Sequence, residues 1–142
     1  MMLGILSALT AGLFTGAAAY VTLVEHPARL SCGTSAAVTE WRPSYRRGTV
    51  MQASLATSAL VLSLATWWKS GGASWLAGGV LIGLVVPFTL LVMLPTNRRL
   101  ADLKLDVTSS EAAALLQRWG RLHTVRTLCS AAAFVILLTA LA

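Results

Sequence analysis

The sequence contains little charge. Only 11% of its 142 residues are Asp, Glu, Lys or Arg, whereas soluble domains carry about 25%. Apolar residues make up 56% of the chain and gather in four long runs separated by polar stretches. A transmembrane helix needs about 20 such residues to cross a hydrocarbon core roughly 30 Å thick. The composition therefore argues against a soluble protein and predicts one integral membrane domain over residues 1–142.

Cysteine and cofactor motifs are also scarce. Cys32 and Cys129 are the only cysteines and do not form a CxxC pair, which argues against a disulfide framework or a cysteine metal motif. The chain has no glycine-rich nucleotide fingerprint and no P-loop. The centres of the apolar runs lack ionisable residues, and ion-coupled transporters usually place such groups there. Coupled transport is therefore not expected.

The four apolar runs predict an all-α fold, a bundle of four transmembrane helices. These helices are expected to cover about residues 2–25, 44–68, 75–95 and 109–141. Pro27 disfavours helical geometry at the residue before it and should end the first helix, which leaves residues 28–42 as a polar loop. Pro43 suits the first turn of the second helix, and Pro87 should kink the third.

The basic residues indicate an orientation. Lys69 alone follows the second helix, whereas ten of the eleven basic residues follow the first and third helices. These ten are Arg29, Arg42, Arg46, Arg47, Arg98, Arg99, Lys104, Arg118, Arg121 and Arg126. Because loops rich in Lys and Arg stay in the cytoplasm, both termini are expected outside a bacterial-type inner membrane or its equivalent. The excess of basic residues is therefore explained by the orientation of the chain in the lipid bilayer. Nucleic-acid binding is not needed to account for it.

Alternating helices would bring four polar segment ends together at the cytoplasmic end of the bundle. We expect a polar site there. Its candidate catalytic residues are His26, His123, Glu25 and Arg126, and its candidate substrate-binding residues are Arg29, Trp41, Tyr45, Gln52, Asn97 and Trp119. An unpaired guanidinium within a membrane is costly, so Arg126 should have a partner. Glu25 is the expected one, because a carboxylate can bind a guanidinium through two hydrogen bonds.

The chemistry of the two histidines stays open at this point. Two imidazoles and a carboxylate can bind a redox metal or move protons near neutral pH. If iron, copper or haem is bound, the expected ligands are His26, His123 and Glu25. Adjacent helical residues point about 100° apart, so Glu25 and His26 would share one metal only where the helix has opened.

Simpler roles account for some of the same residues. A tryptophan at a membrane interface is commonly an anchor, and the exposed arginines fit lipid headgroups. Small residues four positions apart allow helices to approach closely. Gly12 with Gly16, and Gly79 with Gly83, have this spacing. Their faces are expected to pack within the bundle or between the protomers of a homo-oligomer.

Four patterns together resemble a known family. They are Glu25-His26-Pro27-Ala28-Arg29, then Trp41-x-x-x-Tyr45-Arg46-Arg47 with Gln52, then Pro95-Thr96-Asn97, then Leu116-x-x-Trp119-x-x-Leu122-His123-x-x-Arg126. In this order they resemble the anthrone-oxygenase-like membrane family, long catalogued as a domain of unknown function. The resemblance implies a monooxygenase that uses molecular oxygen on an anthrone- or quinone-like aromatic compound, such as an aromatic polyketide.

Three functions follow from these observations. In a membrane oxygenase, His26 or His123 would act as the base, and Arg126 or Arg29 would stabilise the oxyanion that develops. Trp119, Trp41 and Tyr45 would then stack on the rings of the substrate. The first alternative is a non-catalytic binding or accessory membrane protein that uses the basic face. The second is an electron carrier whose metal or haem is bound by the histidines.

Overall fold

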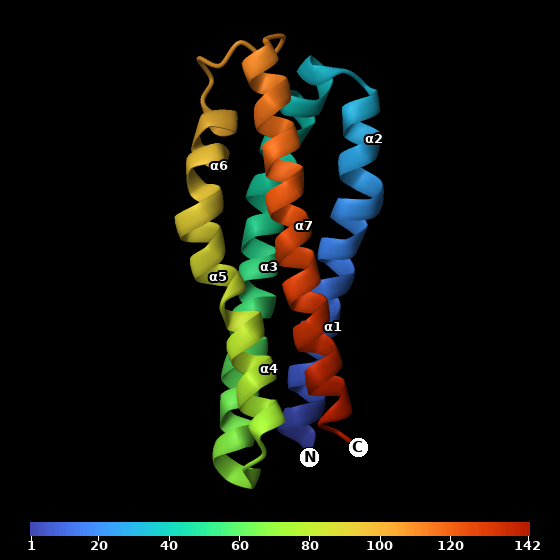
Figure 1. Cartoon of the computed structure of the whole chain (residues 1–142), viewed down its shortest axis with the longest axis vertical. Coiled ribbons are helices and arrows are strands. Elements are labelled where there is room, and N and C mark those ends of the chain that lie inside the picture. Colours follow the sequence, from blue (N-terminus) through green and yellow to red (C-terminus); the bar gives the residue numbers. More distant parts are fainter.

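A computed structural model describes all 142 residues of the chain, and every regular element in it is helical (Figure 1). The elements are α1 (Met2–Tyr20), η1 (Val21–Glu25), α2 (His26–Ser31), α3 (Thr34–Ser70), α4 (Ala73–Gly83), α5 (Val85–Phe88), η2 (Thr89–Met93), α6 (Leu94–Ala101) and α7 (Ser110–Thr139), where η marks a turn of π-helix. They combine into four long helices, Met2–Ser31, Thr34–Ser70, Ala73–Ala101 and Ser110–Thr139. Each is long and apolar enough to span a membrane, as the sequence predicts.

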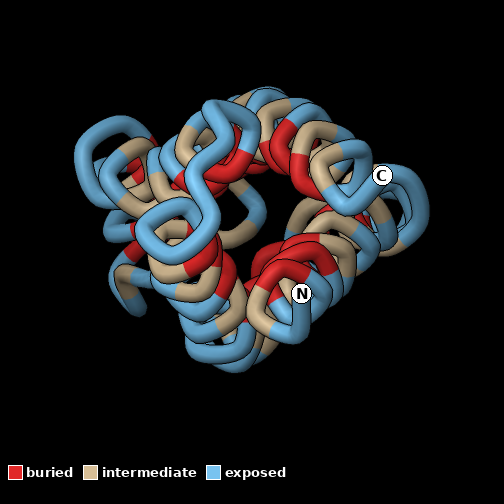
Figure 2. The backbone as a smooth tube through the Cα atoms, turned by 90° about the horizontal axis from the view of Figure 1, so that it is seen from below, coloured by how far each residue is buried: buried red, intermediate tan, exposed pale blue.

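The four helices run alternately up and down. Both termini and the turn between α3 and α4 lie at one end of the bundle, and the other two connections lie at the opposite end (Figure 1). Figure 2 shows buried residues on the inward faces of the helices and exposed residues around the outside. Many of the exposed residues are large and apolar, among them Leu23, Leu91 and Val50. This is the pattern expected of a bundle whose solvent is lipid.

The first helix does not end at Pro27, contrary to the sequence prediction. It continues through α2 to Ser31, and the π-helical turn η1 comes immediately before His26. A proline in a helix clashes with the carbonyl four residues earlier, which here belongs to Leu23 within η1. The wider π-helical turn relieves this clash. The same arrangement recurs in the third helix, where η2 precedes Pro95.

The polar loop predicted over residues 28–42 is also wrong. Only Cys32 and Gly33 separate α2 from α3, and Gly33 has a φ of 86°. Helix α3 begins at Thr34, so Pro43 lies inside it rather than in its first turn. The cause is tertiary packing: Ala37, Val38 and Trp41 are fully buried in an apolar cluster, and this burial stabilises the extra turns.

Pro87 interrupts the third helix as expected. Helix α4 ends at Gly83 and α5 begins at Val85, with Leu84 between them.

The core consists of two apolar clusters. One lies toward the termini and includes Phe14, Ile82 and Leu137. The other lies toward the opposite end and includes Trp41 and Leu116. Buried polar residues lie between the two clusters, namely Gln52, His123 and Thr127, together with the partly buried Arg126. A buried polar layer of this kind has to satisfy its own hydrogen bonds.

The connection between α6 and α7 is ordered by two aspartates. The backbone amide of Lys104 donates to Asp102 Oδ1 at 2.9 Å, and the hydroxyl and amide of Thr108 donate to Asp106 Oδ1. These hydrogen bonds hold the pKa of each carboxyl below its usual value. Ser109 caps α7 by accepting from the Ala112 amide at 3.1 Å.

Small residues bring the helices together. A Cβ placed at Gly12, Gly79 or Gly83 would lie within 3 Å of Phe134, Ser63 or Leu60, respectively, so these three glycines serve contacts within the bundle. Gly78 is as tightly packed, since its Cβ would lie 2.7 Å from Leu137 Cγ. Gly16 differs, because a Cβ there would meet no atom within 4 Å.

We predict that Gly78→Ala destabilises the bundle by about 1–3 kcal/mol, because the added methyl overpacks the α4–α7 contact. Gly16→Ala is the matched control and should be neutral, or more stable by up to about 1 kcal/mol, since alanine favours a helix. Unfolding in mixed detergent, followed by circular dichroism, compares the two. Equal stability of both variants would contradict the close α4–α7 packing.

Candidate functional site

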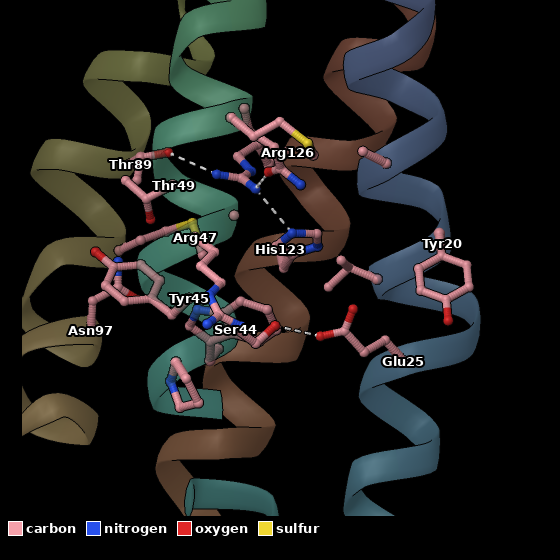
Figure 3. Close-up of a pocket in the computed structure, with 18 of the residues that line it drawn as sticks. Tyr20, Glu25, Ser44, Tyr45, Arg47, Thr49, Thr89, Asn97, His123 and Arg126 are labelled. Carbon is pink, nitrogen blue, oxygen red and sulfur yellow. Dashed lines mark hydrogen bonds between the residues drawn. The ribbon is translucent and has the colours of Figure 1, made fainter. Parts of the chain in front are cut away.

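A cavity of about 560 Å³ lies within the half of the bundle opposite the termini (Figure 3). Its walls come from the end of α1, η1 and α2, from α3, from η2 and α6, and from α7. This volume is typical of a pocket for a small organic molecule. Eight of the ten candidate site residues line it: Glu25, Arg29, Tyr45, Gln52, Asn97, Trp119, His123 and Arg126.

Arg126 lies at the deep end of the cavity, and none of its partners is charged. Its Nη1 lies 3.5 Å from Thr89 Oγ1, and its Nη2 lies 3.0 Å from His123 Nε2 (Figure 3). Nη2 also donates to Gln52 Oε1. Arg126 Cζ sits 5.6 Å from the centre of the Phe14 ring, at cation–π distance. The cavity therefore contains a cation whose charge is not neutralised.

The predicted pairing of Arg126 with Glu25 is wrong. Glu25 pairs instead with Arg29, one helical turn further along the same helix. Ser44 of α3 donates to Glu25 Oε1 at 2.6 Å, and Arg29 Nε lies 2.6 Å from Glu40 Oε2. Because the helix continues through Pro27, Glu25 and Arg29 stand four residues apart on one face, where such pairs meet. This cluster links the first helix to α3.

Hydrogen bonding assigns one tautomer to His123. A guanidinium can only donate, so His123 Nε2 must accept from Arg126. Nδ1 then carries the proton and donates to Thr22 Oγ1 at 2.9 Å. Thr22 donates in turn to Thr127 Oγ1 at 2.8 Å, and Thr127 donates to the His123 carbonyl at 3.0 Å. The imidazole is therefore neutral, with its lone pair directed at Arg126.

His26 does not line this cavity. It is the first residue of α2 and is buried against α7, and neither of its ring nitrogens has a hydrogen-bond partner. Its ring lies 5.0 Å from that of Trp119 and borders a second, smaller cavity of about 350 Å³. His123 and Thr22 also border that second cavity. Both histidines thus pack against the indole of Trp119, but only His123 also lines the larger cavity.

The aromatic residues form a stack beside the cavity. Trp119 lies against the imidazole of His123, with ring centres 4.7 Å apart and planes inclined by 29°. Tyr45 is stacked on Trp41, with ring centres 4.6 Å apart and planes inclined by 7°. Trp41 is fully buried and outside the cavity, so Tyr45 and Trp119 offer ring surfaces to a ligand while Trp41 supports them.

Asn97 is available for a ligand. It lines the cavity and is almost completely buried, yet neither atom of its amide group has a partner within the protein. Buried polar groups are nearly always hydrogen-bonded. A bound molecule with a carbonyl or hydroxyl group could satisfy Asn97 without any change in the backbone.

Glu25, His26 and His123 do not form a set of metal ligands. No three side chains among His, Cys, Asp and Glu gather in a way that could bind a metal ion. Glu25 points toward Ser44, and His26 lies behind Trp119. In continuous helix, neighbouring residues point in different directions, which is why Glu25 and His26 separate.

Sequence reasoning missed several residues that complete the site. Thr22 orients His123, Ser44 and Glu40 hold the cluster around Arg29, and Thr89 contacts Arg126. Hydroxyl residues inside apolar helices commonly bond across to other helices, and this was the available signal for Thr22 and Thr89.

The family model described as anthrone oxygenase matches residues 41–136. This is more than half of the chain, and it includes every cavity residue from Tyr45 to Arg126 but not Glu25, His26 or Arg29. No curated protein and no solved structure matches the chain.

The close contact between Gly120 and His26 gives a stability prediction. A Cβ at residue 120 would lie 2.5 Å from His26 Nε2, so Gly120→Ala should cost about 1–3 kcal/mol of unfolding free energy. The double variant Gly120→Ala with His26→Ala should lose less unfolding free energy than the two single variants lose together, since it removes the clash. Detergent unfolding of all four proteins measures this coupling. Additive effects would contradict the contact.

Proposed function

Because the chain belongs to the anthrone oxygenase family, we propose that it is a membrane-embedded oxygenase acting on an anthrone-like aromatic compound. The observation that carries the proposal is Arg126, a cation in the cavity whose hydrogen-bond partners are all neutral. A fixed positive charge in a site sheltered from water stabilises an oxyanion far better than it would in water.

The proposed reaction begins with binding. The flat rings of the substrate lie against Tyr45 and Trp119, and its carbonyl oxygen approaches Arg126. The oxygen competes with His123 for Nη2 of Arg126, because both accept from that group. When Arg126 turns to the substrate, the lone pair of His123 Nε2 becomes free. Substrate binding thereby produces the base that the reaction needs.

The chemical step is a deprotonation followed by oxygen addition. His123 Nε2 takes a proton from the acidic C–H opposite the ring carbonyl, and the electron pair moves onto the carbonyl oxygen beside Arg126. The resulting carbanion reacts with molecular oxygen at the same carbon, and loss of water leaves the second carbonyl. The balance is anthrone plus O₂ giving anthraquinone plus water. The carbon loses four electrons to O₂, so no other reductant is consumed.

The proton taken by His123 returns to the oxygen that leaves as water, and Thr22 holds the imidazole in place meanwhile. Protonation of His123 at Nε2 leaves the Nδ1 proton on its hydrogen bond to Thr22 Oγ1. Thr22 lines the second cavity, with Gln117, Arg121 and Thr124. Because both methylene hydrogens leave in the water, His123 Nε2 returns its proton to the peroxide oxygen formed from O₂, and this restores the tautomer whose Nε2 accepts from Arg126.

We predict that Arg126→Met lowers anthrone-dependent oxygen uptake by about 10²–10³-fold, the usual cost of losing an oxyanion donor. His123→Ala should lower it by about 10²–10⁴-fold. Arg126→Lys keeps the charge and should retain more activity than Arg126→Met. Arg118→Met on the same helix, outside the cavity, is the control and should behave as wild type.

Oxygen consumption by purified protein in vesicles, with anthraquinone quantified by its absorption, measures these effects. Arg126→Met with wild-type turnover would reject the role of this cation. Wild-type protein that binds anthraquinone but consumes no oxygen would instead favour the non-catalytic binding protein that the sequence also allows.

The proposed orientation places the cavity near the cytoplasmic face, in keeping with the ten basic residues at that end. Cys32 is exposed at that end and Ser70 is exposed at the opposite one. We predict that a membrane-impermeant maleimide labels Cys32 only after cells are permeabilised. Ser70→Cys, in a Cys32→Ser background, should be labelled in intact cells. The reverse labelling pattern would place the cavity on the outer side.

A further inference from the structure

The route into the cavity can be read from the side chains that border it. On the first helix these include Ala17, Tyr20 and Val21, and on α3 they include Gly48 and Met51. Tyr20 is 58% exposed and Met51 is 50% exposed, so the cavity reaches the outer surface of the bundle between these two helices. Figure 3 looks through this side, with Tyr20 at the edge and α7 behind the cavity.

The first helix and α3 are tied together on either side of this opening. Toward the termini, Ser7 Oγ donates to the Ala59 carbonyl at 3.0 Å. Toward the opposite end, Ser44 and Glu40 of α3 bind the Glu25–Arg29 pair. No side-chain hydrogen bond joins the two helices between these ties. The gap between them is framed by Tyr20, Gly48 and Met51, and we name it the lateral opening.

The lateral opening lies within two membrane spans. Tyr20 belongs to the span Met2–Ser31, and Gly48 and Met51 belong to Thr34–Ser70. Exposed apolar side chains lie beside it on both helices, for example Val24 at 51% and Val50 at 70% exposure, and the exposed Arg46 and Arg47 next to Gly48 suit the headgroup edge of the membrane. Such a surface faces lipid. A molecule that enters here therefore comes from the bilayer, on the side of the membrane where the cavity lies.

The aqueous end of the cavity is comparatively closed. The Arg29 side chain is only 4% exposed. It spans from Glu25 to Glu40 and lies 5.7 Å from the Trp119 ring centre. Opening this end would separate the buried Arg29 cation from the partly exposed Glu25 and the half-exposed Glu40, and a buried cation left without its partners is unfavourable. The lateral opening needs no such change.

We infer that the cavity is loaded sideways from the bilayer through the lateral opening, and that its substrate is therefore an uncharged, lipophilic aromatic compound that ionises only beside Arg126. The inference rests on the proposed function for the nature of the substrate. Beyond that function, it specifies the route by which the substrate enters and that the substrate is uncharged when it enters. A permanently charged analogue is excluded, because a charge does not enter hydrocarbon readily.

Gly48 provides a test with a matched control. A Cβ at Gly48 would meet no heavy atom within 4 Å, and the same holds at Gly16. Both glycines lie in membrane-spanning helices, but only Gly48 lines the cavity. A phenylalanine at residue 48 should obstruct the opening, whereas one at residue 16 should face lipid.

The measurement is the rate at which anthraquinone quenches tryptophan fluorescence, followed by stopped flow in proteoliposomes. Trp67 and Trp68 are exposed and are replaced by Phe in every protein compared, so that quenching of Trp119, which lines the cavity, reports arrival there. We expect Gly48→Phe to slow association by about tenfold or more, with Gly48→Leu intermediate and Gly48→Ala close to wild type. Gly16→Phe should bind at the wild-type rate. Anthraquinone-2-sulfonate should not quench the wild-type protein.

Equal association rates in Gly48→Phe and Gly16→Phe would overturn the inference, as would rapid quenching by the sulfonate. If Gly48→Phe does not fold, Gly48→Leu decides by comparison with Gly16→Leu: equal association rates would overturn the inference. Oxygen uptake with anthrone separates the two proposals. If the wild type consumes oxygen but the Gly48 variants associate with anthraquinone at the wild-type rate, only sideways loading is rejected. If association depends on residue 48 but no oxygen is consumed, only the oxygenase activity is rejected. Neither binding nor uptake in the wild type rejects both.

Discussion

The rest of the site depends on one buried cation, Arg126. A guanidinium inside a bilayer is costly unless polar groups replace its water, and each neighbouring helix supplies part of that replacement. Gln52 comes from α3 and Thr89 from η2, while Phe14 of α1 offers its ring. These partners are dipoles and not carboxylates, so they solvate the charge without cancelling it. An anion is therefore the ligand that this end of the cavity favours most.

Two π-helical turns, each followed closely by a proline, contribute to the wall of the cavity that contains Arg126. Pro27 and Pro95 each follow a π-helical turn, and both turns line the cavity, η1 through Val21 and Glu25 and η2 through Thr89 and Met93. A π-helical turn adds a residue to one turn and disturbs regular packing, and such turns are frequent at functional sites. The backbone adjustment that accommodates each proline thus lies in the wall of the cavity, whereas α4 and α7 pack closely around Gly78.

The sequence allowed the prediction of four apolar helices and of most cavity residues, because hydrophobic runs and polar segment ends are local signals. It did not allow the prediction of partners. Ending the first helix at Pro27 removed the spacing that pairs Glu25 with Arg29, so Glu25 was assigned to Arg126 instead. The turns from Thr34 to Pro43 were missed because their stability comes from burying Trp41 against distant segments. His26 was grouped with His123, but it packs closely against Gly120 of α7 and does not line the larger cavity, and this tertiary contact has no local signal in the sequence.

In the proposed reaction, the neutral partners of Arg126 also explain why binding energy would favour the transition state. An uncharged substrate gains little from a cation while its oxygen is a neutral carbonyl. It gains most when deprotonation places negative charge on that oxygen, and only interactions that strengthen in this way accelerate a reaction. A carboxylate beside Arg126, such as the Glu25 partner predicted from sequence, would have compensated the cation before the substrate arrived. The local pairing of Glu25 with Arg29 keeps that carboxylate away, and so leaves the charge of Arg126 available to the developing oxyanion.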